Sequence, residues 1–181
     1  SSDLDQVEEV VYHPVEQQFS QHLQNPSCGI TKFAGKCVED LLFVEIFAGT
    51  ARLSKVARDT GFQALPIDKT TARASQIFIA QYDLTEPESL QAIIDILTTE
   101  KDRILAVHLA PACGTASRAR EKKLTSFAKR GFKIPGPLRS QKQPMGIDGL
   151  SGLDKVRTET ANLVYAATAK LIEVCHNLQI L

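Results

Sequence analysis

The 181-residue sequence lacks several features that mark other classes of protein. No stretch approaches the ~18 consecutive apolar residues of a membrane span, so no association with a membrane is expected. The four cysteines include no C-x-x-C pair, which disfavours a disulfide framework and favours reduced thiols. The N-terminus has neither a basic start nor an apolar run, so no signal peptide is predicted. We therefore expect an intracellular protein, nuclear if eukaryotic and otherwise cytoplasmic.

The chain also lacks net charge, because 21 Lys and Arg residues balance 21 Asp and Glu residues. A general affinity for polyanions is therefore not expected. The cations are nevertheless concentrated, with nine Lys or Arg and one Glu in residues 118–142. Such a segment favours contacts with nucleic-acid phosphates, and a solvated loop surface is the alternative. The candidate nucleic-acid-binding residues are Arg118, Arg120, Lys122, Lys123, Lys129 and Arg130.

The length suits one domain with a full hydrophobic core. Between residues 4 and 19 apolar side chains recur at helical spacing, and a dense turn signal follows at residues 25–29. We therefore expect a helical appendage over residues 1–35 and the main domain over residues 36–181.

From residue 41 onward, short apolar runs alternate with helical stretches, a pattern typical of a parallel sheet with crossover helices. Strands are predicted at residues 41–46, 62–67, 77–80 and 104–109, and helices at 51–60, 86–98 and 156–175. The last helix is marked by apolar-face residues Val156, Thr160, Leu163, Val164, Ala167, Leu171 and Cys175. The predicted fold is an α/β, Rossmann-like parallel sheet with strand order 3-2-1-4 and helices on both faces. Because residues 178–181 look like the start of another strand, we expect C-terminal strands to be missing.

In an open parallel sheet, ligands bind beyond the carboxyl ends of the strands. The loop Phe47-Ala48-Gly49-Thr50 follows the first strand and precedes a helix, so its small residues let backbone N–H groups approach a ligand closely. It contains one glycine, whereas a dinucleotide fingerprint requires G-x-G-x-x-G. A role in binding pyrophosphate is therefore disfavoured.

Two aspartates follow the next two strands. The carboxylate of Asp68 is placed to accept hydrogen bonds from both ribose hydroxyls of a nucleoside, and a solvated turn residue or helix cap is the alternative. Asp83 is placed to accept from an adenine amino group, although its position before a helix favours a cap.

Cys113 follows the fourth strand in a Pro111-Ala112-Cys113-Gly114 turn. An exposed loop thiol beside a basic segment is a candidate nucleophile, and a packing residue is the alternative. His108, inside the fourth strand, is expected to be a core histidine and not a general base. No metal site is predicted, because the other Cys and His residues match no zinc-ligand spacing.

The order of FAGTARLS, Asp68, Tyr82-Asp83 and PACGTASRAR resembles the DNA cytosine-5 methyltransferases. The first motif of that family reads F-A-G-x-G-G, and its catalytic motif reads P-P-C-Q with a following serine. The resemblance implies a class I methyltransferase fold, S-adenosylmethionine as cofactor and DNA as partner. It places Cys113 as the nucleophile that attacks cytosine C6. The implied cofactor-binding residues are Phe47, Ala48, Gly49, Thr50, Asp68, Asp83 and Pro111.

Several positions depart from the family pattern. Ala112 replaces the second proline, Gly114 replaces the glutamine, and Ala51-Arg52 replaces the glycine pair that ends the first motif. The family's Glu-Asn-Val motif would follow the next strand, beyond the end of this sequence. Two alternatives stay open: a catalytically degenerate module that binds nucleic acid or a protein through residues 118–142, and a methyltransferase for another substrate in which Cys113 is structural.

Overall fold

The computed structural model describes residues 32–33, 35–117, 120, 122 and 136–180. The chain separates into two units, Ser1–Thr31 and Lys32–Leu181, and all described residues belong to the second. The predicted appendage over residues 1–35 therefore lies almost wholly outside the described residues.

The central sheet is parallel throughout. It contains β3 (Leu42–Ile46), β4 (Gln63–Asp68), β5 (Ala80–Gln81) and β6 (Ile104–Leu109) in the order β5-β4-β3-β6. When only the strands of this sheet are numbered along the chain, β3, β4, β5 and β6 become strands 1, 2, 3 and 4. The observed order is then 3-2-1-4, and the predicted order is confirmed. The third strand is shorter than predicted and begins at Ala80. A separate antiparallel pair, β1 (Lys32–Phe33) with β2 (Lys36–Cys37), precedes the sheet.

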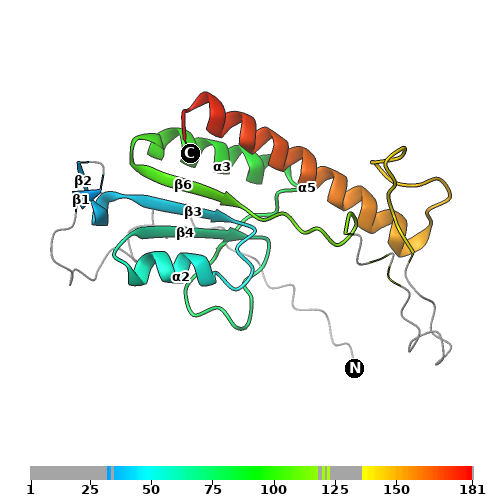
Figure 1. The fold of residues 1–181 in the computed structure, drawn as a ribbon, viewed down its shortest axis with the longest axis horizontal. Coiled ribbons are helices and arrows are strands. Elements are labelled where there is room, and N and C mark those ends of the chain that lie inside the picture. Colours follow the sequence, from blue (N-terminus) through cyan, green and yellow to red (C-terminus); the bar gives the residue numbers. More distant parts are fainter. Residues whose placement is uncertain (1–31, 34, 118–119, 121, 123–135, 181) are drawn as a thin grey trace, which may run out of the picture. The chain divides into compact units, whose positions relative to one another are not determined.

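Helices cover both faces of the sheet. In Figure 1, α2 (Arg52–Asp59) lies on one face, and α3 (Pro87–Glu100) and α5 (Gly152–Asn177) lie together on the other. Two short 3-10 turns, η1 (Val38–Asp40) and η2 (Lys101–Arg103), precede β3 and β6. The predicted mixed α/β, Rossmann-like arrangement is therefore confirmed, and many functions share it. Within the described ranges, no helix is both long and apolar enough to span a membrane.

The core is built where the sheet meets these helices. Val44, Ile46 and Ile67 on the central strands are fully buried, and Leu97 of α3 and Leu171 of α5 are fully buried as well. Strands covered on both faces need apolar residues on both, which is why β3 and β4 appear in the sequence as nearly continuous apolar runs. Burying each such side chain contributes about 1.5–3 kcal/mol relative to leaving it exposed.

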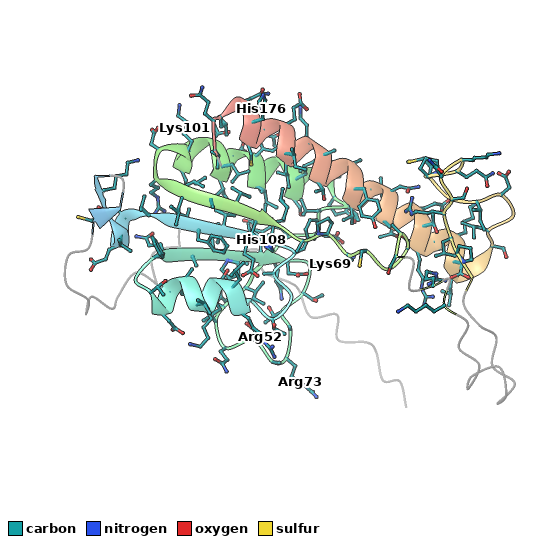
Figure 2. The ribbon with its side chains drawn as sticks, viewed as in Figure 1. Arg52, Lys69, Arg73, Lys101, His108 and His176 are labelled. Atoms are coloured by element: carbon teal, nitrogen blue, oxygen red, sulfur yellow. The ribbon has the colours of Figure 1, made fainter. Side chains whose placement is uncertain are left out.

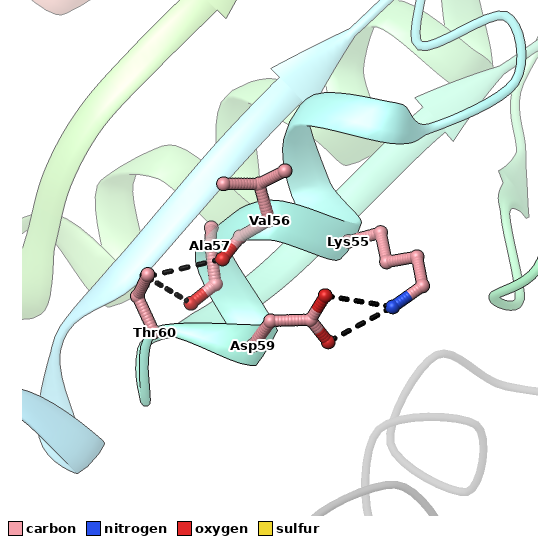
Figure 3. A network of polar contacts seen from close by, with 5 residues as sticks. All are labelled: Lys55, Val56, Ala57, Asp59 and Thr60. Atoms are coloured by element: carbon pink, nitrogen blue, oxygen red, sulfur yellow. Dashed lines mark hydrogen bonds and ion pairs between the residues drawn. The ribbon is translucent and has the colours of Figure 1, made fainter.

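Side-chain hydrogen bonds and a glycine mark the C-terminal end of α2 (Figure 3). The Thr60 hydroxyl donates to the carbonyls of Val56 and Ala57 at 3.1 and 2.9 Å, which satisfies groups left unpaired in the last turn. Lys55 and Asp59 form an ion pair on the exposed side at 2.7 Å. Gly61 follows with φ of 96°, a conformation that glycine adopts without strain.

The predicted apolar face of α5 is only partly correct. Ala167 and Leu171 are buried, but Val156 and Leu163 are 57% and 55% exposed. Figure 1 shows the first half of α5 extending past the carboxyl ends of the strands. This half therefore does not rest on the sheet. It buries Thr158 instead, whose methyl group faces Gly146.

Candidate functional site

The loop between β3 and α2 has an unusual backbone. Phe47, Gly49 and Ala51 all have positive φ, at 64°, 56° and 54°. For Phe47 and Ala51 this left-handed conformation costs about 1–2 kcal/mol each, so the surrounding structure must hold it in place. A Cβ added to Gly49 would meet no atom within 4 Å, so the loop is open on that side. Strain of this kind is concentrated at functional sites, so residues 47–50 stay a candidate binding loop.

Backbone and side-chain hydrogen bonds attach this loop to β4. Ala48 N–H donates to the Ile67 carbonyl at 3.0 Å, and Gly49 N–H donates to Asp68 Oδ2 at 2.7 Å. These two hydrogen bonds therefore hold the loop beside the carboxyl end of β4. Two of the predicted cofactor elements, Gly49 and Asp68, are thus in direct contact.

The Asp68 carboxylate keeps part of its accepting capacity. Its Oδ1 accepts from Lys69 N–H at 2.7 Å, while Oδ2 accepts from Gly49. Each carboxylate oxygen has about two acceptor directions, so one remains on each oxygen. Asp68 is therefore a turn residue that also retains acceptors for two further hydroxyl groups.

The carboxylate of Asp83 forms more interactions within the chain than that of Asp68. Its Oδ1 accepts from the N–H and hydroxyl of Thr85 at 3.0 and 2.7 Å, and its Oδ2 pairs with Lys69 Nζ at 2.5 Å. Burial raises the pKa of this carboxyl, but the bonds from Lys69 and Thr85 and the Lys69 charge outweigh it and hold the pKa below its ordinary value. Asp83 stabilises the turn before α3, whose N-cap is Glu86.

This network predicts a pH dependence for Asp83→Asn. Because the folded-state pKa is lowered, the stabilisation by ionised Asp83 is present at neutral pH and is lost as pH falls below about 4. Urea unfolding at pH 7 should show the variant less stable than the wild type, and the difference should shrink toward pH 3. Asp40→Asn, at an exposed position, is the control. Equal differences at both pH values would contradict this account.

Sequence reasoning missed Glu45, a buried carboxylate in the middle of the apolar strand β3. Its Oε2 accepts from Ser54 N–H at 2.8 Å and from the Ser54 hydroxyl at 2.5 Å, and both residues are buried. Ser54 lies in the first turn of α2, where the helix dipole stabilises an anion. Glu45 therefore fixes the start of α2 and, with it, the far end of the loop. A lone charged residue in an apolar run was the available signal.

The Cys113 turn lies beyond β6, next to this loop. Ala110 N–H donates to the Ile46 carbonyl at 3.2 Å, which places the start of the segment at the end of β3. The Cys113 carbonyl accepts from Ala116 and Ser117 N–H at 3.0 and 2.8 Å, forming a tight turn. The Cys113 thiol is free and the residue is exposed. Strand order reverses between β3 and β6, and ligands of open α/β sheets bind beyond the carboxyl ends of the strands at such a point.

His108 is not the core histidine that was predicted. It is exposed on β6, in register with Glu45 of β3, and Figure 2 shows it near the carboxyl ends of the strands. Among the described strands β6 lies at the edge of the sheet, so its side chains have less cover than those of β3.

The predicted nucleic-acid contacts are described only in part. Arg120 donates to the Gly136 carbonyl at 3.0 Å and lies 3.5 Å from an Asp154 oxygen, with its side chain 19% exposed. Lys122 is exposed. Arg118, Lys123, Lys129 and Arg130 lie outside the described residues. In the part of the chain that the structure covers, no three or more His, Cys, Asp or Glu residues are grouped to hold a metal ion.

Comparisons with protein-family models, curated proteins and solved structures found no match for this chain.

Proposed function

We propose that this chain is an S-adenosylmethionine-dependent methyltransferase domain of the DNA cytosine-5 type, with Cys113 as its nucleophile. The proposal rests on the motif resemblance together with the position of these motifs at one edge of the sheet. The observation that carries it is the 2.7 Å hydrogen bond from Gly49 N–H to Asp68, which joins the candidate cofactor loop to the candidate ribose acceptor.

The proposed cofactor site uses groups that are already positioned. The Phe47–Thr50 loop presents an open backbone for the methionine part, and Asp68 retains one acceptor direction on each oxygen for the ribose hydroxyls. The adenine contact of Asp83 requires Lys69 to move aside. The Lys69 side chain is 62% exposed, so it can leave its ion pair at little cost.

The proposed chemistry needs an accessible thiolate. The sulfur of Cys113 adds to C6 of a cytosine that has left the duplex, and electron density then rises at C5. Bound S-adenosylmethionine would supply the methyl group to C5 and would leave as S-adenosylhomocysteine. Loss of the C5 proton to water and departure of the Cys113 thiolate would then restore the aromatic ring. DNA is accordingly the proposed partner, with a nuclear location in a eukaryote and a cytoplasmic one otherwise.

Titration with S-adenosylhomocysteine by calorimetry tests the cofactor site. We expect micromolar binding by the intact protein and at least about 100-fold weaker binding by Asp68→Ala, because two hydrogen bonds to a charged group contribute about 1.5–3 kcal/mol each, or about 3–6 kcal/mol together. Asp59→Ala, which removes an exposed carboxylate at the other end of α2, should bind normally. No binding by the wild type would rule out the methyltransferase function.

A binding module without catalysis is the second candidate. It is favoured by the engagement of Asp83 with Lys69 and Thr85, and by Ala112 and Gly114 in place of the family's proline and glutamine. Such a module would bind a DNA duplex without binding S-adenosylhomocysteine. Fluorescence anisotropy at several salt concentrations would identify it, because affinity that depends on phosphate contacts falls steeply with salt.

A further inference from the structure

Arg139 joins three separate parts of the structure around the Cys113 turn. Its Nε donates to the Thr115 hydroxyl at 3.2 Å, within the turn itself. Its Nη1 donates to Asn162 Oδ1 on α5 at 2.6 Å and to the Pro144 carbonyl, and its Nη2 donates to the Thr158 carbonyl at 3.2 Å. One guanidinium thus connects the turn, the segment before α5 and α5 itself.

Arg139 differs from an ordinary phosphate-binding arginine. Four of its five N–H donors are already used within the chain, so little capacity remains for a phosphate. All of these acceptors are neutral, and among the described residues no carboxylate lies within 4.0 Å of the guanidinium. Arg120, in contrast, lies close to the Asp154 carboxylate. The planar guanidinium of Arg139 therefore has a structural role, in which its hydrogen bonds hold separate segments of the chain together.

A second contact reaches the turn from the same helix. The Tyr165 hydroxyl donates to the Ala112 carbonyl at 3.0 Å, and the Arg139 guanidinium lies over the Tyr165 ring, 5.2 Å from its centroid. The residues contacted, Ala112 and Thr115, lie on either side of Cys113 in the sequence. The nucleophile candidate is therefore bracketed by two contacts that both depend on α5.

We propose that Arg139 and Tyr165 are positioning residues that hold the Cys113 turn against α5, and this inference rests on the proposed function. Restricting an exposed turn to one conformation costs backbone conformational entropy. A nucleophile held in the wrong position loses much of the rate acceleration that correct orientation provides. The first half of α5 therefore contributes Thr158 and Asn162, which hold Arg139, and Tyr165 in the middle of the same helix contacts the turn directly.

The local order of the turn can be measured without any activity. A nitroxide attached to Cys113, in a background of Cys28→Ser, Cys37→Ser and Cys175→Ser, reports its mobility by electron paramagnetic resonance. We expect Arg139→Gln and Tyr165→Phe each to increase the mobile component. Arg139→Lys should not restore order, because an ammonium cannot reproduce the guanidinium fork. Arg157→Gln, an exposed change on the same helix, should leave the spectrum unchanged. An unchanged spectrum in both Arg139→Gln and Tyr165→Phe would overturn the proposal.

Activity then separates this inference from the proposed function. With DNA containing 5-fluorocytosine, we expect Arg139→Gln to form the covalent complex about 100-fold more slowly than the wild type, while its affinity for S-adenosylhomocysteine stays within about twofold. Equal rates of capture in the two proteins would reject the positioning role. Absence of capture by the wild type would reject the proposed function, and the mobility measurement would still decide whether Arg139 anchors the turn.

Discussion

Cys113→Ser is expected to abolish covalent capture of 5-fluorocytosine DNA and to lower methyl transfer by roughly 1000-fold or more. A serine hydroxyl at neutral pH is a far weaker nucleophile than a thiolate, and no base is hydrogen-bonded to this side chain among the described residues. The residue is exposed, so the fold should not change. Transfer of a labelled methyl group to duplex DNA measures the rate, and denaturing electrophoresis detects the covalent complex.

The control for this prediction is Cys175→Ser on α5. Burial raises the pKa of the Cys175 thiol, which disfavours its thiolate form, and its replacement should leave methyl transfer intact. Both variants should bind S-adenosylhomocysteine as the wild type does. Undiminished methyl transfer by Cys113→Ser would show that this cysteine is structural and that the methyl acceptor is another substrate.

Glu45→Ala is expected to lower the free energy of unfolding by about 2–4 kcal/mol. The change leaves the N–H and hydroxyl of Ser54 buried without their acceptor and removes an anion from the positive end of α2. The start of α2 also ends the loop that contains Gly49. We therefore expect weaker binding of S-adenosylhomocysteine as well, although Glu45 itself is buried.

Denaturant unfolding followed by circular dichroism measures this effect. Glu39→Ala on η1 is the matched control, because that glutamate is exposed and should change stability by less than about 0.5 kcal/mol. Ser54→Ala should be milder than Glu45→Ala, since it removes one donor and keeps the buried backbone bond. Equal stability of the Glu45 and Glu39 variants would contradict the proposed role of the buried carboxylate.

Much of the fold could be predicted because its signals are local. The apolar runs that became β3, β4 and β6 are short and bounded by turn residues, and Gly61 marks the end of α2. Right-handed crossover connections then leave few possible strand orders, which is why the predicted order was correct. The third strand was misplaced because its two-residue ladder carries almost no periodic signal.

The predicted exposure of side chains was less reliable, because exposure depends on what packs nearby. His108 was expected in the core, yet the structure leaves it exposed on β6. Val156 and Leu163 have helical apolar spacing, yet this part of α5 passes beyond the sheet. Periodicity shows which residues share a helix face and does not show whether that face meets a neighbour.

The sequence by itself determined the order of the strands, the loop after β3 and the position of each candidate residue at the end of a strand. These follow from hydrophobic patterning and turn chemistry, which act over a few residues. Only the tertiary structure decided that the Asp68 carboxylate accepts a hydrogen bond from Gly49 N–H and that Lys69 forms an ion pair with Asp83. It also decided that hydrogen bonds from Arg139 join α5 to the Cys113 turn. The physical reason is that side-chain hydrogen bonds between distant segments depend on distances and directions that exist only after the sheet and helices have packed.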